Sequence, residues 1–261
     1  MRVFKRIFLV FLFILIFLFI TTLIYVYNHY NVPILTYHSI NNFYIGTPVV
    51  KSENFEKQVK YLHDHKYNVI TLDELVDNIK NNKNMPRDTV VITFDDGFKD
   101  NYSNAYPILK KYKIPATIFL ISNCIGNKSE YLTWQEINEM LKGGVFFGGH
   151  TKNHVYLPNV SLAVAYQEIK GSKEQIEANT GQVITMFSYP AGGFDNNIKK
   201  IVEKAGFKAA CTTNRGYNKA SCDIFELKRI KVTDKDAQNL LKFRMKISGY
   251  YDVFRRLKNP S

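Results

Sequence analysis

The stretch Val90-Val91-Ile92-Thr93-Phe94-Asp95-Asp96-Gly97 indicates both the fold class and the place of the chemistry. Its apolar, β-branched first half predicts a buried strand, and the glycine at its end permits a sharp turn. Two adjacent carboxylates therefore stand where this strand ends. Because neighbouring carboxylates repel each other, such a pair is costly unless a cation or a proton gives the two groups different states. On its own the motif is more often an ordinary turn, so its meaning depends on the partners that the fold brings to it.

Two imidazoles occupy a similar place further along the chain. His150 and His154 lie four positions apart, shortly after the apolar run 145–147. One carboxylate with two histidines is a ligand set of catalytic zinc sites, which leave one coordination position open for water. The second carboxylate would then be free to act as a base. Taken alone, the two histidines are more often surface or core residues, but the two motifs together favour a metal hydrolase.

Strand-like and helix-like segments alternate through the body of the chain. The predicted strands are residues 34–37, 90–94, 116–121, 145–147, 185–189, 209–212 and 227–232. Helices are predicted to start near Thr71 and Thr133, where capping boxes occur, and to cover 161–178 and 199–205. This alternation predicts an α/β fold with a parallel sheet under helical cover, either open or closed into a barrel. Barrels gather active-site groups at the carboxyl ends of their strands, so the separated motifs can form one site.

The N-terminal segment predicts a membrane anchor. Residues 7–27 are mostly apolar, and a helix of that length spans the hydrocarbon core of a bilayer, about 30 Å. Basic residues within 1–6 place this end in the cytoplasm and the body outside, with membrane lipid as a partner. A cleaved signal peptide is the alternative, but it normally has a shorter apolar region and a small-residue cleavage site. Residues 28–33 are expected to be a linker.

The net charge limits the kinds of partner that are expected, and the cysteines bear on metal binding and disulfide pairing. The formal net charge is +12, from 35 Lys and Arg against 23 Asp and Glu. A body outside the membrane argues against nucleic acid and favours anionic lipid or wall polymers. A basic tail, residues 237–261, is expected to be helical. Cys124, Cys211 and Cys222 are an odd set without Cys-x-x-Cys spacing, so none is assigned to a metal, and pairing of Cys211 with Cys222 stays open.

The two chemical motifs resemble those of polysaccharide deacetylases, the NodB-homology family of carbohydrate esterases. The pair Asp95-Asp96 in its Thr-Phe-Asp-Asp-Gly setting matches the first motif, and His150-Thr151-x-x-His154 matches the second. The resemblance covers 34–236 and implies a distorted (β/α) barrel of about seven strands. It also implies that Asp96, His150 and His154 bind Zn²⁺, or another divalent metal such as Co²⁺ or Ni²⁺, and that Asp95 is the base.

The chain departs from the family at its third motif. Ser188 stands where the family usually has the arginine that orients the base, and Tyr189-Pro190-Ala191 follows. Arg229 is the expected replacement, and a surface arginine on the barrel rim is the alternative. The backbone N–H of Ala191 is expected to donate to an oxyanion. The side chains expected to contact a sugar are those of Trp134, Tyr189, Pro190 and Phe194, with core packing the alternative for Trp134.

The family's late histidine motif, the source of its general acid, is absent because His154 is the last histidine of the chain. His38, directly after the first predicted strand, is the expected substitute. This opening resembles the branch that deacetylates poly-β-1,6-N-acetylglucosamine of biofilms. In that branch the strand order is circularly permuted and a Tyr-His pair near the start supplies the acid. A buried or capping histidine is the alternative reading of His38.

The resemblance therefore implies a zinc-dependent N-deacetylase acting on N-acetylglucosamine units of an extracellular or cell-wall polysaccharide, with the biofilm polymer favoured over peptidoglycan. Asp95 would take a proton from water, and His38 would protonate the leaving amine. Two alternatives stay open. One is an amidase acting on peptidoglycan or another acylated glycan, and the other is a catalytically weak surface protein that binds glycans. The sequence leaves linkage, chain length and oligomeric state open.

Overall fold

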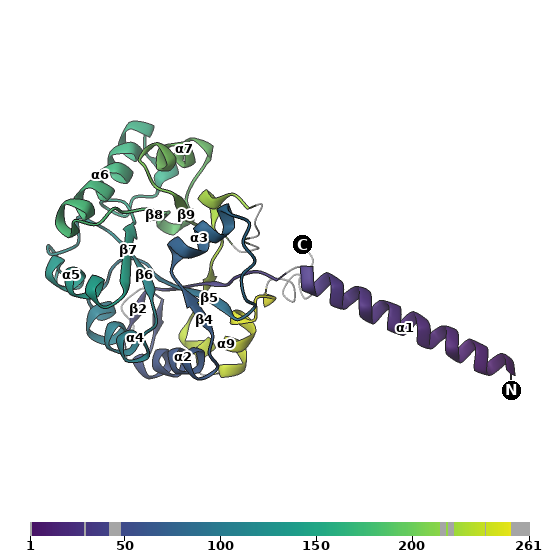
Figure 1. Cartoon of the computed structure of the whole chain (residues 1–261). Helices are drawn as coiled ribbons and strands as arrows, with labels where there is room; N and C mark the ends of the chain where they lie inside the picture. Colours follow the sequence, from purple (N-terminus) through teal and green to yellow (C-terminus); the bar gives the residue numbers. More distant parts are fainter. Residues whose placement is uncertain are drawn as a thin grey trace.

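The computed structural model describes residues 2–28, 30–41, 48–214, 218, 222–237 and 239–251. It has a body built on a curled parallel sheet and one helix, α1 (Arg2–Asn28), that extends away from it (Figure 1). Within the described residues, α1 is the one helix that is long and apolar enough to cross a membrane, over Phe4–Tyr25. None of that span is buried by the body, so α1 contributes nothing to the core.

Seven parallel strands run in the order β10-β1-β5-β6-β7-β8-β9, and β4 pairs with β5 as an eighth. Their bounds are β1 (Ile34–Tyr37), β4 (Asn68–Ile70), β5 (Thr89–Phe94), β6 (Ala116–Leu120), β7 (Val145–Gly149), β8 (Met186–Ser188), β9 (Ala209–Cys211) and β10 (Ile230–Lys231). Every residue of β5 is buried, as expected for a parallel strand covered on both faces. The predicted α/β barrel-like architecture is confirmed.

The segment that leads into β10 links the two ends of the sheet. Leu227 forms a parallel bridge with Cys211 of β9. Three residues later, Ile230 pairs with Leu35 of β1. The single strand predicted here is therefore divided between two neighbours, because the chain crosses from one end of the sheet to the other. Arg229 lies between these two contacts.

Helices cover the sheet. They are α2 (Ser52–Asp64), α3 (Leu72–Lys80), α4 (Tyr106–Tyr112), α5 (Trp134–Lys142), α6 (Leu162–Thr180), α7 (Asn196–Lys204), α8 (Asp234–Ala237) and α9 (Leu240–Ile247). Thr133 with Glu136 forms the complete capping box predicted on α5. On α3 only half of the predicted box is present, since the Thr71 side chain accepts from the Glu74 N–H. The sequence-based prediction lacks α2, α4, α8, β4 and the two-residue strands β2 (Ser39–Ile40) and β3 (Val49–Val50).

Helix α3 lies over the middle of the curled sheet (Figure 1). Its buried residues Leu72, Leu75, Val76 and Ile79 share one apolar cluster with the first residues of β1, β8 and β9. The interior of the sheet is thus closed at the amino ends of the strands. The carboxyl ends remain as the place for a site.

Helix α9 belongs to the body rather than to a separate tail. Phe243 and Ile247 are fully buried in the main core, and the buried Lys246 pairs with Asp236 at 2.7 Å. The domain therefore continues beyond the boundary predicted at residue 236. The last part of the predicted basic tail, 252–261, lies outside the described residues.

Candidate active site

One cavity of about 450 Å³ opens at the carboxyl ends of the strands. Its wall contains every residue to which the sequence assigned a chemical role: Asp95 and Asp96 after β5, His150 and His154 after β7, His38 after β1, Ala191 after β8, and Arg229 before β10. These residues come from five separate segments, and the curl of the sheet brings them together.

Asp96, His150 and His154 converge on a single point. The Asp96 Oδ1 atom lies 3.5 Å from His150 Nε2 and 3.6 Å from His154 Nε2. Two ligands of one tetrahedral ion lie about 3.3 Å apart when each bond is about 2.0–2.1 Å. The backbone is left-handed at Asp96 (φ 75°) and at His154 (φ 58°). Such conformations cost about 1–3 kcal/mol each and persist where the surrounding structure enforces them, often at functional sites.

Hydrogen bonding fixes the tautomer of His150. Its Nδ1 lies 2.7 Å from the Ser188 carbonyl oxygen, which can only accept, so Nδ1 carries the proton. The Nε2 lone pair then faces Asp96, as in metal sites where a second partner orients the ligating histidine.

The charges of the three side chains also suit a cation. Burial lowers the pKa of His150 to about 4 and also lowers that of His154, so both imidazoles are neutral near pH 7. Burial and the neighbouring Asp95 raise the pKa of Asp96 to about 7. A divalent cation would supply the positive charge that ionised Asp96 lacks. The donor set therefore fits a divalent metal.

Helix α6 holds the loop that carries the two histidines. The buried Glu168 accepts hydrogen bonds from the backbone N–H groups of Lys152 (3.0 Å) and Asn153 (2.9 Å). Inside the loop, Thr151 Oγ1 accepts from the N–H of His154 at 2.9 Å. Glu168 carries no recognisable sequence signal, since a glutamate on a helix does not indicate which loop its carboxylate will hold.

Asp95 is clamped by Arg229. The two guanidinium nitrogens Nη1 and Nη2 each donate to one carboxylate oxygen at 2.7 Å, and both side chains are almost completely buried. Nη2 also donates to Ser188 Oγ at 2.9 Å. Ser188, at the position of the family's arginine, thus supports an arginine from the segment just before β10. Burial opposes ionisation of Asp95, yet Arg229 and His150 hold the pKa of Asp95 well below its usual range.

His38 and Ala191 complete the cavity wall. Among the described residues, the buried His38 Nδ1 has no hydrogen-bond partner, and burial lowers the pKa of His38. Ala191 has a left-handed backbone (φ 50°) and lines the cavity. Among the described residues, its N–H makes no backbone hydrogen bond outside its own short 3-10 turn.

The predicted sugar-contacting residues lie elsewhere. Tyr189 is fully buried, donates its hydroxyl to the Phe225 carbonyl at 3.1 Å and stacks on Phe194 with ring centroids 4.8 Å apart. A ring with no exposed surface cannot stack on a sugar, so that assignment of Tyr189 is wrong. Pro190 is also buried, and Trp134 and Phe194 pack against the core without lining the cavity.

Tyr156 offers an exposed aromatic surface that the sequence analysis missed. It lies two residues after His154, and its side chain is nearly half exposed. A Cβ atom added at Gly193 would lie 2.3 Å from its ring, so the ring rests directly on the loop that carries Ala191. Its only sequence signal is its closeness to the histidine motif.

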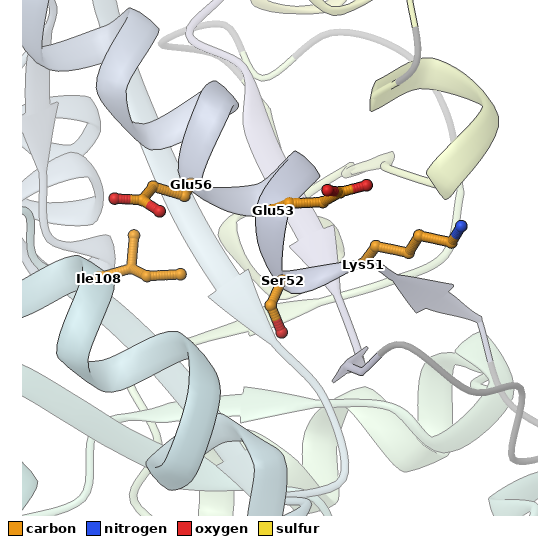
Figure 2. A pocket seen from close by; sticks show the side chains of 5 residues that line it. All are labelled: Lys51, Ser52, Glu53, Glu56 and Ile108. Carbon is orange, nitrogen blue, oxygen red and sulfur yellow. The ribbon is translucent and has the colours of Figure 1, made fainter.

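A second hollow, of about 490 Å³, lies where the start of α2 faces α4 (Figure 2). Figure 2 shows the carboxylates of Glu53 and Glu56 pointing away from each other. Glu56 is paired with Lys111 at 2.6 Å. This hollow therefore gathers no set of metal ligands or catalytic groups.

Zinc binding is expected to displace a proton from Asp96. Because the metal-free carboxyl has a pKa of about 7, it is mostly protonated at pH 6 and must ionise to bind the metal. Titration calorimetry in buffers of different ionisation enthalpy should show release of about one proton at pH 6. The same release from an Asp96→Asn variant would contradict the assignment.

Comparison with known proteins gives one consistent family. A family model described as polysaccharide deacetylase matches residues 82–210. YxkH of Bacillus subtilis, assigned to the polysaccharide deacetylases, is 36% identical over 202 residues, covering 77% of this chain and 71% of that protein. A poly-β-1,6-N-acetyl-D-glucosamine N-deacetylase of Staphylococcus aureus is 30% identical over 206 residues, covering 74% and 71%.

Solved structures show the same similarity. The deacetylase PplD of Streptococcus pyogenes, in complex with acetate, matches with a TM-score of 0.76 at 30% identity, covering 81% of this chain and 97% of that one. A structure of IcaB from Ammonifex degensii matches with a TM-score of 0.72 at 24% identity, covering 81% and 95%, which supports the fold. The family match at 82–210 includes the Asp-Asp and His-x-x-x-His motifs but neither His38 nor Arg229.

Proposed function

Because the chain belongs to the polysaccharide deacetylase family, we propose that it is a metal-dependent N-deacetylase of N-acetylglucosamine units in an extracellular or cell-wall polysaccharide. One observation carries this proposal: a convergent Asp96–His150–His154 set lies beside a second carboxylate, Asp95, that Arg229 holds ionised. Two adjacent carboxylates in different electrostatic environments can take different roles in one reaction.

The three converging residues would hold the cation, which, when bound, supplies polarisation of the acetamide carbonyl and a lowered pKa for water. Asp95, kept ionised and fixed at both oxygens, accepts the proton of the attacking water. The N–H of Ala191 donates to the oxygen on which negative charge develops. His38 must be in its imidazolium form, which burial disfavours and the nearby charge of Asp95 favours. From that form it donates a proton to the departing nitrogen and becomes neutral, because expulsion of an unprotonated amine anion is prohibitive.

The position of Arg229 weakens the alternative of a catalytically weak glycan-binding protein. That alternative rested on the missing family arginine at Ser188 and on the missing late histidine. Arg229 contacts Asp95 through both Nη atoms, and His38 lines the same cavity. The pocket therefore contains a group for each step of amide hydrolysis.

The favoured polymer is poly-β-1,6-N-acetylglucosamine, and peptidoglycan is the second candidate. The first choice is supported by the Staphylococcus aureus relative named for that activity. It is also supported by His38, which stands near the start of the chain, where the branch resembled has its general acid. Tyr156, beside the cavity, is the aromatic surface proposed to stack on a sugar ring of the chain.

Acetate release from defined substrates tests the function. Zinc-loaded protein is expected to release acetate from fully acetylated β-1,6-linked N-acetylglucosamine oligomers faster than from peptidoglycan glycan strands. Asp95→Asn protein is the control for contaminating esterases. Faster release from peptidoglycan would replace the favoured polymer by the second candidate, and no release from any acetylated glycan would contradict the function.

We also propose that α1 anchors the protein in the cell membrane with the catalytic domain on the outer side. Support comes from the length and apolar character of Phe4–Tyr25 and from the basic residues Lys5 and Arg6 at its start. The full chain should then stay with membranes after a high-salt wash. Recovery of a shortened chain lacking α1 in the medium would show a cleaved signal peptide instead.

A further inference from the structure

Beside the cavity, a π-helical turn holds the segment that carries His38. This turn, η1 (Asn101–Ala105), begins four residues after Gly97, and π-helical turns are rare and frequent at functional sites. Asn101 is fully buried, and its Nδ2 donates to the His38 carbonyl oxygen at 2.8 Å. The backbone of the proposed acid is thus bonded to a side chain from the segment that carries the proposed base.

Asp100 holds the next two residues. Its Oδ1 accepts from the Ile40 N–H at 3.1 Å, and its Oδ2 accepts from the Ser39 hydroxyl. Asn104, one turn further on, donates from Nδ2 to the Ile40 carbonyl at 2.7 Å. Three consecutive residues, 38–40, are therefore each bonded to the stretch 100–104.

Core packing alone does not account for this arrangement. Asp100 is 8% exposed, and no cation pairs with it among the described residues. A buried carboxylate without a cation costs stability unless hydrogen bonds compensate, and here the compensation comes mainly from the His38 segment. An apolar residue would fill the same space without that cost.

The end of β5 also ties this segment to the base. The N–H of Asp95 donates to the Tyr37 carbonyl at 2.9 Å, next to His38 in the chain. Hydrogen bonds from Asp95 and Asn101 to the backbone on both sides of His38 therefore fix its position relative to the stretch 95–101. A shift of about 1 Å in a catalytic group can cost about 10²-fold in rate, so the spacing of acid and base matters.

We infer that Asp100 and Asn101 are positioning residues that hold His38 at the distance from the substrate nitrogen needed for proton transfer. This inference rests on the proposed function. It predicts that Asn101 acts through His38 and through no other residue.

A double-mutant cycle tests it with zinc-loaded full-length protein. Asn101→Leu should slow acetamide hydrolysis about 10–100-fold but barely change hydrolysis of an aryl acetate ester, whose leaving group needs no proton. In a His38→Ala background, the same Asn101→Leu change should alter the amide rate less than about twofold, because the group it positions is gone. Asp100→Asn should show the same amide-selective loss.

Asn138→Leu is the matched control. Asn138 Nδ2 also donates to backbone carbonyls, those of Trp134 (2.9 Å) and Asn179 (3.1 Å), but on α5, away from the cavity wall. It should change amide and ester rates equally or not at all. Equal losses on both substrates for Asn101→Leu and Asp100→Asn, or additive losses with His38→Ala, would overturn the inference. Absence of amide hydrolysis in the unaltered protein would instead refute the proposed function.

Discussion

The Asp95→Asn variant is expected to keep its zinc and to lose about 10²–10⁴-fold in acetate release, the usual contribution of a positioned base. An amide has the shape of the carboxylate but cannot accept the proton of water. The substitution also leaves the buried Arg229 without its partner, so the melting temperature should fall. Zinc content, rate and thermal unfolding measured on the same preparation separate these effects.

Asp96→Asn is the matched comparison, since it makes the same chemical change one residue away. It should lower zinc content as well as rate, because Asp96 Oδ1 lies 3.5 Å and 3.6 Å from the Nε2 atoms of His150 and His154, the two other proposed ligands. If the two variants lose zinc to the same extent, both carboxylates bind the metal, and Asp95 is not a separate base.

Arg229→Met is expected to give the second large effect, on stability and rate together. Removing one partner of a buried ion pair typically costs about 3–5 kcal/mol, because the remaining charge is left uncompensated. Asp95 would then lose the main group that keeps its pKa low, and its two oxygens would no longer be fixed. Denaturant unfolding should show the stability loss, and the acid limb of the pH–rate profile should move to higher pH.

The stability of the parent protein should also depend on pH, and the direction is set by the lowered pKa of Asp95. A carboxyl whose pKa is depressed in the folded state contributes stability above its unfolded pKa, near 3.8, and loses it as the pH falls below that value. Arg229→Lys keeps the charge but not the two-point contact, and should lie between the parent and Arg229→Met. An Arg229→Met protein with unchanged rate and pH profile would show that Arg229 is only a structural residue.

Hydrophobic patterning predicted most of the sheet. The run 90–94 is apolar and β-branched, and it forms the fully buried β5 (Thr89–Phe94). The two-residue pair β2 and β3 was not predicted, because such short strands carry no periodicity. The strand predicted at 227–232 is split because its residues pair with two different strands, a choice made by tertiary contacts alone.

Site residues can be predicted where a short sequence motif itself contains the chemically active side chains. Ligand type and position after strands single out one carboxylate of the Asp95–Asp96 pair together with His150 and His154, and the family resemblance assigns Asp96. The structure brings the ligand atoms of Asp96, His150 and His154 within 4.8 Å of one another. Supporting residues such as Glu168 and Asn101 are not predictable in this way, because their hydrogen-bond partners are set by tertiary contacts and not by a local motif. Tyr189 was misassigned because a sequence does not reveal which face of an aromatic ring is covered.

The central claim is that Asp96, His150 and His154 hold a divalent cation in front of Asp95. Anomalous diffraction at the zinc edge from crystals of the zinc-loaded protein tests it most directly. We expect one strong peak bonded to the Asp96 carboxylate and to Nε2 of both histidines at about 2.0–2.2 Å, with Asp95 still held by Arg229. A peak elsewhere, or a zinc ion bonded to Asp95 in place of Asp96, would contradict it.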